Sequence, residues 1–215
     1  MLLIFDWDGT LADSQEHIVN AMQAAIEALQ LPEHSRESCA QMIGLGLSEV
    51  ALRLFPGAGV DAHQAFIESY SYHFTRLRQQ YGGTQFFPDA ISTLNALHTH
   101  GHQLAIATGK SRRGLNRVLD ADNIAHLFAA TRAADETASK PNPLMLEEIL
   151  SETGVGVGDA VMIGDTSYDL EMARNLDMRR IGVSYGVHHV EVLREYKPAI
   201  IIDSLAELLQ WPALR

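Results

Sequence analysis

The sequence predicts an α/β protein, in which a parallel sheet carries helices on both faces and an all-helical unit is inserted near the N-terminus. Short apolar runs typical of buried strands alternate with longer amphipathic stretches typical of helices. This alternation indicates βαβ units, whose strands are parallel. One segment, residues 15–82, has helical patterns and no candidate strand, and it is far longer than a crossover needs.

The predicted strands are short runs rich in Leu, Ile, Val and Ala, as expected for strands that are buried on both faces. The first helix of the core lies between Pro88 and Gly101, residues favoured at a helix start and just after a helix end. Strands are predicted at residues 2–5, 103–107, 160–163, 180–183 and 199–202. Core helices are predicted at residues 88–100, 112–120, 143–153, 168–177 and 204–210.

The inserted segment is predicted to be a separate helical cap. Helices are expected at residues 17–29, 47–55 and 62–81, the first with the apolar spacing of an amphipathic helix. The predicted domains are a core of residues 1–14 and 83–215 and a cap of residues 15–82. Candidate hinges are Asp13-Ser14 and Gly82-Gly83. The alternative is a long crossover packed rigidly on the sheet.

Composition narrows the classes of partner. The 215 residues are 47% hydrophobic and 20% charged, and the net charge of −11 argues against a general nucleic-acid-binding surface. With only three lysines, an anionic ligand must be held by a metal, helix N-termini or one placed lysine. The single cysteine, Cys39, excludes an intramolecular disulfide. The first apolar run ends at Asp6, too soon for a signal peptide, and no run is long enough to span a membrane. We therefore expect a cytoplasmic protein that needs no nucleic-acid, membrane or obligate protein partner.

Reactive polar groups follow three of the predicted strands. Asp6 and Asp8 follow the first strand, Thr108 follows the second, and Asp165 follows the third, with Asp169 four residues later. Because the carboxyl ends of neighbouring strands in an open α/β sheet border one crevice, these groups are expected to converge on a single pocket.

These residues, in this order, resemble the four motifs of the haloacid dehalogenase-like hydrolase superfamily. The helical insert is similar to the subgroup that includes phosphoglycolate phosphatases and β-phosphoglucomutases, and the motif order covers nearly the whole chain. The resemblance implies a Rossmann-like core with an inserted cap. It is carried by Asp6-Trp7-Asp8-Gly9-Thr10-Leu11, Thr108, Lys140-Pro141 and Gly164-Asp165-Thr166-Ser167-Tyr168-Asp169.

The resemblance implies that two aspartates of the first motif carry the reaction. Asp6 would attack phosphorus and form an aspartyl-phosphate. Asp8 would protonate the leaving alkoxide and then activate water. The alternatives are a capping or turn aspartate at position 6 and an Asp-Gly turn at position 8, but the pair before Gly-Thr favours the catalytic roles.

The resemblance also implies a Mg²⁺ site, because two anions facing a phosphate need a cation between them. Mg²⁺ prefers oxygen ligands, here Asp6, Asp165 and the backbone carbonyl of Asp8. Asp169 would support the metal's waters. Otherwise Asp165 is a helix N-cap and Asp169 a first-turn acid that complements the helix dipole.

Thr108 and Lys140 would hold the transferring phosphoryl group, and Gly9, Thr10 and Gly109 would bind substrate near it. A solvated loop is the alternative for Lys140. For Lys110, a site role and a surface position are equally compatible with the sequence. The segment Gly44-x-Gly46 is expected to form a turn between cap helices that places Leu45 or Leu47 over the pocket.

Departures from relatives favour one reaction. Dehalogenases of the superfamily lack the second aspartate of the first motif, which this chain has as Asp8. Phosphonatases form a Schiff base with a lysine of the cap, and the insert of this chain contains no lysine. We expect a Mg²⁺-dependent phosphatase that hydrolyses a small phosphomonoester, phosphoglycolate-like or a sugar phosphate. A phosphosugar mutase and a non-catalytic phosphate-binding module are the alternatives.

Overall fold

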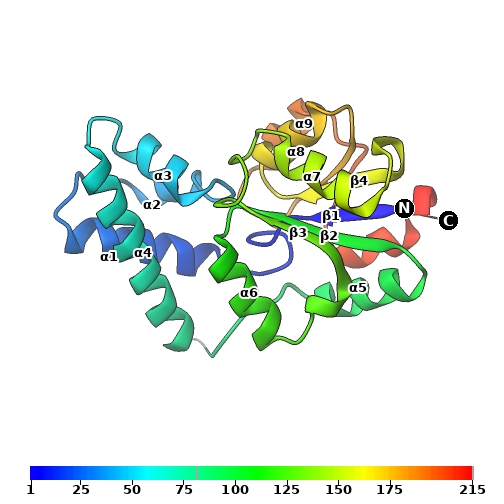
Figure 1. Ribbon diagram of the computed structural model, residues 1–215, viewed down its shortest axis with the longest axis horizontal. Coiled ribbons are helices and arrows are strands. Elements are labelled where there is room, and N and C mark those ends of the chain that lie inside the picture. The colour runs from blue at the N-terminus through cyan, green and yellow to red at the C-terminus, as the bar shows by residue number, and fades with distance from the viewer. Residues whose placement is uncertain (81, 215) are drawn as a thin grey trace.

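The computed structural model describes residues 1–80 and 82–214, and it contains the predicted parallel sheet (Figure 1). All strand pairs are parallel, and the strand order is β3-β2-β1-β4-β5-β6. The predicted fold class is therefore confirmed. The strands are β1 (Leu2–Phe5), β2 (Gln103–Thr108), β3 (Phe128–Ala133), β4 (Ala160–Gly164), β5 (Arg179–Val183) and β6 (Ile200–Ile202).

Helices cover both faces of the sheet because successive side chains of a strand point to opposite faces. In β1, Leu3 and Phe5 belong to one apolar cluster, and Leu2 and Ile4 belong to another. The first cluster includes side chains of α5 (Ala90–Thr99) and α6 (Arg112–Ala121), and the second those of α7 (Leu144–Thr153) and α8 (Ser167–Arg174). The remaining short elements of the core are α9 (Val190–Glu195) and the 3₁₀ helices Ala125–Leu127, Val157–Asp159, Leu205–Gln210 and Pro212–Leu214.

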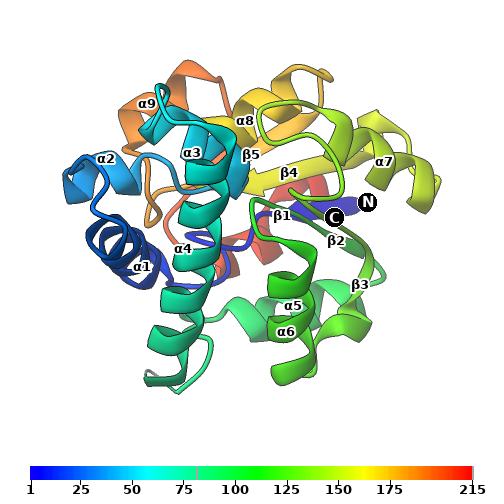
Figure 2. The same ribbon diagram turned by 60° about the vertical axis from the view of Figure 1, so that its left-hand side comes forward.

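The inserted segment is helical throughout its described part. Helices α1 to α4 lie beside the end of the sheet that is opposite the chain termini (Figures 1 and 2). Their buried side chains form an apolar cluster of their own, drawn from residues 18–70. Tyr168 and Val187 of the core pack against this cluster, and the division into cap and core stays a prediction. The helices are α1 (Gln15–Ala28), α2 (Arg36–Ala40), α3 (Leu47–Leu54) and α4 (Val60–Gln80).

Some predicted boundaries were wrong. Strand β3 was missed because its sequence, FAATRA, is partly exposed at the sheet edge and lacks a continuous apolar run. The short helices α2 and α9 were also missed. Residues 205–210 form a 3₁₀ helix instead of an α-helix. The predicted end of the long cap helix, Tyr81, lies outside the described residues. Among the helices of the described chain, none is both long and apolar enough to cross a bilayer.

Candidate active site

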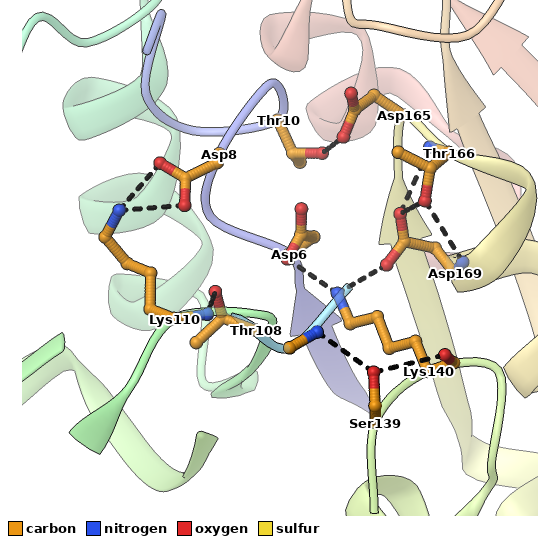
Figure 3. Close-up of polar contacts among 11 residues, drawn as sticks. Asp6, Asp8, Thr10, Thr108, Lys110, Ser139, Lys140, Asp165, Thr166 and Asp169 are labelled. Carbon is orange, nitrogen blue, oxygen red and sulfur yellow. Dashed lines mark hydrogen bonds and ion pairs between the residues drawn. The ribbon is translucent and has the colours of Figure 1, made fainter. Parts of the chain in front are cut away.

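The predicted site residues lie together at the carboxyl ends of the central strands (Figure 3). Asp6 follows β1, Asp165 follows β4, and Thr108 is the last residue of β2. Strand β1 pairs with β2 on one side and with β4 on the other, so the chain changes direction across the sheet here. Such a switch point leaves a crevice in which α/β proteins bind ligands.

Asp6 is buried with one oxygen bound and the other free. Its backbone N–H donates to the carbonyl of Ile163 at 2.9 Å, which fixes it beside β4. Oδ1 accepts a hydrogen bond from Lys140 at 2.6 Å, whereas the buried Oδ2 has no hydrogen-bond partner in the described chain. Burial raises the pKa of this carboxyl well above its ordinary value, although the Lys140 ammonium opposes the effect.

Lys140 is 1% exposed and bridges two carboxylates. Its Nζ lies 2.6 Å from Oδ1 of Asp6 and 2.6 Å from Oδ1 of Asp169. Burial alone would lower the pKa of the ammonium, but the two carboxylates outweigh it and raise this pKa above its ordinary value. The alternative of a solvated loop lysine is therefore wrong.

Asp165 is held by two donors from distant parts of the chain. Thr10 donates its hydroxyl to Oδ1 at 2.9 Å, and the backbone N–H of Val187 donates to Oδ2 at 2.9 Å. Burial, together with the charge of Asp169, raises the pKa of Asp165 to about 7 against these two hydrogen bonds. Asp165 is not the N-cap of α8, because Thr166 occupies that position.

Asp169 is tied to the start of α8 and to Lys140. Its Oδ2 accepts hydrogen bonds from the backbone N–H and the hydroxyl of Thr166, at 3.1 and 2.6 Å, in a capping box. Gly164 leaves the room for this, since a Cβ there would lie 2.4 Å from Cβ of Asp169. Asp169 is a first-turn acid, as one alternative held, but it also anchors the buried lysine.

The three carboxylates fit a divalent cation. Ligand atoms of Asp6, Asp165 and Asp169 lie within 4.8 Å of one another. The Lys140 ammonium pairs with two of these three buried carboxylates, Asp6 and Asp169, so the group carries an excess of negative charge. In the described chain, Oδ2 of Asp6 has no hydrogen-bond donor. A hard cation that prefers oxygen ligands would satisfy both the charge and the free oxygen.

Asp8 is paired with a different lysine, Lys110. Lys110 Nζ lies 2.8 Å from both oxygens of Asp8, and the hydroxyl of Ser14 donates to Oδ1 at 2.6 Å. The Asp8 carboxylate points toward Lys110 and not toward Asp165 (Figure 3). Because the Lys110 side chain is only 10% exposed, the surface interpretation of this lysine is wrong. Ser14 was predicted only as a hinge residue.

The remaining predicted residues make close contacts within the protein. Thr108 is buried, and its hydroxyl oxygen accepts a hydrogen bond from the backbone N–H of Lys110 at 3.2 Å. A Cβ at Gly9 would lie 2.2 Å from Oδ2 of Asp165. A Cβ at Gly109 would lie 2.7 Å from the carbonyl oxygens of Gly44 and Leu45. Glycine is thus required where the first loop meets Asp165 and where the cap meets the core.

A cavity of about 780 Å³ opens above these residues. Asp6, Asp8, Gly109 and Lys110 line it from the core. Leu45 lines it from the turn between α2 and α3, and Leu47 lines it from the first residue of α3, as the Gly44-x-Gly46 pattern predicted. The volume is in the range of pockets that enclose small organic ligands.

Sequence reasoning missed several supporting residues. Val187 and Gly186 lie in the loop after β5, where a Cβ at Gly186 would approach Cβ of Asp165 to 2.1 Å. No motif marks this loop, and only the pairing of β4 with β5 brings it near Asp165. Ser139, which accepts a hydrogen bond from the Gly46 N–H at 2.9 Å, was also missed. Thr166 could have been found, because Thr followed three residues later by Asp is a capping signal.

Comparison with known proteins agrees with this geometry. The family model of haloacid dehalogenase-like hydrolases matches residues 3–183. The chain belongs to the haloacid dehalogenase-like hydrolase family. The match runs from β1 to the end of β5 and so includes all four motifs.

Similar proteins cover nearly the whole of this haloacid dehalogenase-like hydrolase. The probable phosphatase IndB of Dickeya dadantii is 31% identical over 97% of this chain and 91% of its own length. A phosphoglycolate phosphatase of Aliivibrio fischeri is 29% identical over 97% of this chain and 94% of its own. The crystal structure of a predicted phosphoglycolate phosphatase from Haemophilus somnus has the same fold, with a TM-score of 0.85 and 23% identity over 97% and 96% of the two chains. This haloacid dehalogenase-like hydrolase is therefore an enzyme of the phosphatase type.

Proposed function

We propose that the protein is a Mg²⁺-dependent phosphatase that hydrolyses a small phosphomonoester through an aspartyl-phosphate on Asp6. The observation that carries the proposal is the setting of Asp6, which lines the cavity, is bound on one oxygen by Lys140 and keeps the other free of hydrogen bonds in the described chain. An anionic oxygen held in place by an ammonium, with a second oxygen facing the ligand space, suits a nucleophile.

Each neighbouring group has a role in this reaction. When the incoming phosphate takes Lys110 from Asp8, the Asp8 carboxylate takes up a proton from solvent. Asp6 then attacks phosphorus, the ester P–O bond breaks, and Asp8 gives this proton to the leaving oxygen. Asp8 then removes a proton from the water that hydrolyses the acyl phosphate and releases inorganic phosphate. The hydroxyl of Thr108 and the backbone N–H groups after it donate to phosphoryl oxygens, and Lys140 offsets the charge that accumulates around Asp6.

Mg²⁺ would be held by Asp6, Asp165 and the backbone carbonyl of Asp8. When bound there, the metal would offset the repulsion between these carboxylates and the phosphate of the substrate. Asp169 is committed to Lys140 and Thr166, so we assign it to positioning the lysine and to hydrogen bonds with metal-bound water. Thr10 and Val187 orient Asp165, which gives Thr10 a role in addition to the predicted substrate contact.

The substrate class follows from the relatives and the cavity. Two of the three named above carry the name phosphoglycolate phosphatase, which makes phosphoglycolate or a related small phosphomonoester such as a sugar phosphate the first candidate. The helical cap would close over the substrate, exclude bulk water and reopen for product release. A cytoplasmic location, expected from the sequence, fits a metabolite as substrate.

Phosphate release from a panel of phosphomonoesters, with Mg²⁺ and with EDTA, tests the proposal. The panel includes phosphoglycolate, hexose phosphates and nucleotides. Asp6→Asn removes the anionic nucleophile, and Asp159→Asn is the matched control at an exposed aspartate. We expect turnover that EDTA abolishes, that Asp6→Asn lowers by at least about a thousandfold and that Asp159→Asn leaves unchanged. Activity that survives in Asp6→Asn, or in EDTA, would contradict the proposal, and isomerised phosphosugar without phosphate release would indicate a mutase.

A further inference from the structure

The outer part of the cavity is lined by basic side chains from two facing helices. Arg76 and Arg78 belong to α4, and Arg113 and Arg117 belong to α6. With Lys110, five of the sixteen lysine and arginine residues of the chain border this one cavity. In a protein of net charge −11, this is a strong local concentration of positive charge.

These arginines are not paired with carboxylates in the part of the chain that the structure describes. Arg117 donates to the hydroxyl of Thr75 at 2.9 Å, and Arg78 donates to Thr84 at 3.4 Å. The buried Nε of Arg78 has no acceptor among residues 1–80 and 82–214. Elsewhere the arginines that make ion pairs have glutamate partners, namely Arg36, Arg53, Arg112, Arg132 and Arg174. A buried N–H without an acceptor costs free energy, so an acceptor is expected from outside the chain.

The acidic groups that line the cavity do not supply this acceptor. Asp8 is bound by Lys110, Asp6 is bound by Lys140, and Glu68 accepts a hydrogen bond from Gln64 at 2.8 Å. The positive charge of the outer cavity therefore remains available to a ligand. Guanidinium groups bind carboxylates and phosphates through paired hydrogen bonds, which makes an anionic group the natural ligand.

The arginines lie beyond the catalytic groups along both helices. Lys110, beside Asp8, lies 5.1 Å from the ring centroid of Phe74. Arg78 lies one turn after Phe74 on α4, and Arg113 and Arg117 lie on the first two turns of α6 after Lys110. A turn rises about 5.4 Å, so the basic group begins about 5–10 Å beyond Lys110. The cavity lining also includes the apolar side chains of Ile18, Met22 and Leu45.

We propose that the substrate is a phosphomonoester with a second anionic group, a carboxylate or a phosphate, that Arg78, Arg113 and Arg117 bind at the outer end of the cavity. The inference rests on the proposed phosphatase function and narrows its substrate class. Because Arg78 is on α4 of the cap segment and the other two are on α6 of the core, the second anion binds both parts at once. Binding of the second anion thereby favours closure of the cap segment onto the core when the substrate carries such a group.

A matched set of substrates isolates the second anion. Sorbitol 6-phosphate, 6-phosphogluconate and sorbitol 1,6-bisphosphate share a six-carbon chain and differ at the end remote from the ester phosphate, which is neutral, a carboxylate or a phosphate. We expect kcat/KM to be at least about tenfold higher for one of the two anionic compounds than for sorbitol 6-phosphate. The two anionic arms distinguish carboxylate from phosphate.

Variants then connect the preference to the arginines. Arg113→Gln and Arg78→Gln are expected to raise KM for the preferred anionic compound about tenfold, to leave KM for sorbitol 6-phosphate within twofold, and to change kcat little. Arg113→Lys keeps the charge and should recover part of the affinity. Arg194→Gln is the control, since Arg194 is an exposed arginine of α9 that is outside the cavity lining.

Binding to Asp6→Asn protein with Mg²⁺, measured by calorimetry, separates this inference from the proposed function. Tighter binding of an anionic compound than of sorbitol 6-phosphate, lost in Asp6→Asn/Arg113→Gln, supports the second-anion site even if the wild-type protein turns over no ester. Equal affinity and equal kcat/KM across the three compounds overturn the inference and leave the phosphatase proposal intact. An equal loss of affinity for all three compounds in Arg113→Gln and Arg78→Gln also overturns the inference.

Discussion

Asp6 and Asp8 each face a lysine, but the two ion pairs have different surroundings. The Lys140–Asp6 pair is closed off from solvent, with side chains 0% and 1% exposed, whereas the Lys110–Asp8 pair is 10% and 11% exposed and borders the cavity. A buried pair is costly to break because each partner would be left charged in a medium of low polarity. Lys140 is therefore a fixed part of the site, and Lys110 is positioned to exchange Asp8 for an incoming phosphate.

Lys110→Met tests the role of the second pair. Without the ammonium, the Asp8 carboxylate loses both of its 2.8 Å contacts and is held only by the 2.6 Å hydrogen bond from Ser14. We expect kcat to fall about ten- to a hundredfold, a loss typical of a misplaced proton-transfer group. Mg²⁺ affinity, measured by calorimetry, should change little, since Lys110 does not touch the three clustered carboxylates. Lys197→Met, at an exposed lysine, is the control. An unchanged kcat in Lys110→Met would show that Asp8 does not need this partner.

His188 makes stability depend on pH. It is buried, and Nδ1 accepts a hydrogen bond from the Ser167 N–H at 3.0 Å, which requires the ring to be neutral at that atom. Burial lowers the pKa of His188 below its ordinary value of 6.5, although the Asp169 charge opposes the shift. The unfolded chain therefore binds this proton more readily, and the His188 contribution to the free energy of unfolding falls as pH decreases below 6.5. The raised pKa values of Asp6 and Asp165 contribute with the opposite sign, so the His188 contribution is measured as a difference between two variants.

Urea unfolding between pH 7.5 and 5 measures this dependence, which is at most about 1.4 kcal/mol per pH unit for one proton. The free energy of unfolding of the wild type, taken relative to that of His188→Gln, should fall as pH decreases through this range. His126→Gln, at an exposed histidine, should leave the profile as it is in the wild type. A difference between wild type and His188→Gln that does not change with pH would show that His188 does not supply this dependence.

At the scale of elements, the turn between α2 and α3 joins the cap segment to the core. Gly44 has a φ of +98°, and its carbonyl faces Gly109 at the end of β2. The Gly46 N–H donates to Ser139, and the Tyr168 hydroxyl of α8 donates to the Gln41 carbonyl at 2.9 Å. The turn thus contacts the chain just after β2, β3 and β4. Thr108, Lys140 and Asp165 lie in or next to these three places.

Gly109→Ala tests whether this contact matters for activity. The added Cβ would lie 2.7 Å from two carbonyl oxygens of the turn, so the turn must move away from the core. We expect kcat/KM to fall at least about tenfold, because a displaced turn no longer encloses the substrate. The melting temperature should change little, since the clash lies between two packed units and not within either. Gly158→Ala, where a Cβ meets nothing within 4 Å, is the control. Full activity in Gly109→Ala would show that the contact between this turn and Gly109 is not needed for catalysis.

At the scale of the whole molecule, the cap segment leaves and re-enters the core at one place. The Asp13 N–H donates to the Gln85 carbonyl at 2.7 Å, and an antiparallel bridge pairs Ala12 with Phe86. The two ends of the insert are thus adjacent. Its buried apolar cluster shares no residue with the two that sandwich the sheet, although Tyr168 and Val187 of the core pack against it. An insert whose ends are adjacent and whose buried side chains pack mainly with one another can be deleted with little change to the packing of the remaining core.

Replacement of residues 15–82 by a short Gly-Ser linker tests this division. We expect the remaining core to unfold cooperatively in urea and to bind Mg²⁺, because the three clustered carboxylates and Lys140 all belong to it. Phosphatase activity should fall strongly, since the cap lining of the cavity is gone. A product that fails to fold would show that the insert is an integral part of one core, as the crossover alternative holds.

The fold class and the position of the main site groups could be read from the sequence. Apolar strands that end in Asp6, Thr108 and Asp165 are local patterns, and the parallel arrangement brings their ends together whatever the loops do. The burial of these strands on both faces is also a local property, because it requires uninterrupted apolar residues. Edge strand β3, with its mixed sequence, shows where this signal fails.

What the tertiary structure alone decided is which side chains meet across the site. Lys110 pairs with Asp8 across 102 positions of the chain, and Thr10 donates to Asp165 across 155. The outer arginines border one cavity because α4 and α6 both line it, and Arg117 of α6 donates to Thr75 of α4. Periodicity places a residue on a face of its own element, but contacts between elements depend on how those elements pack. The chemistry was therefore set by local sequence, and the pairing of charges by the packing of distant segments.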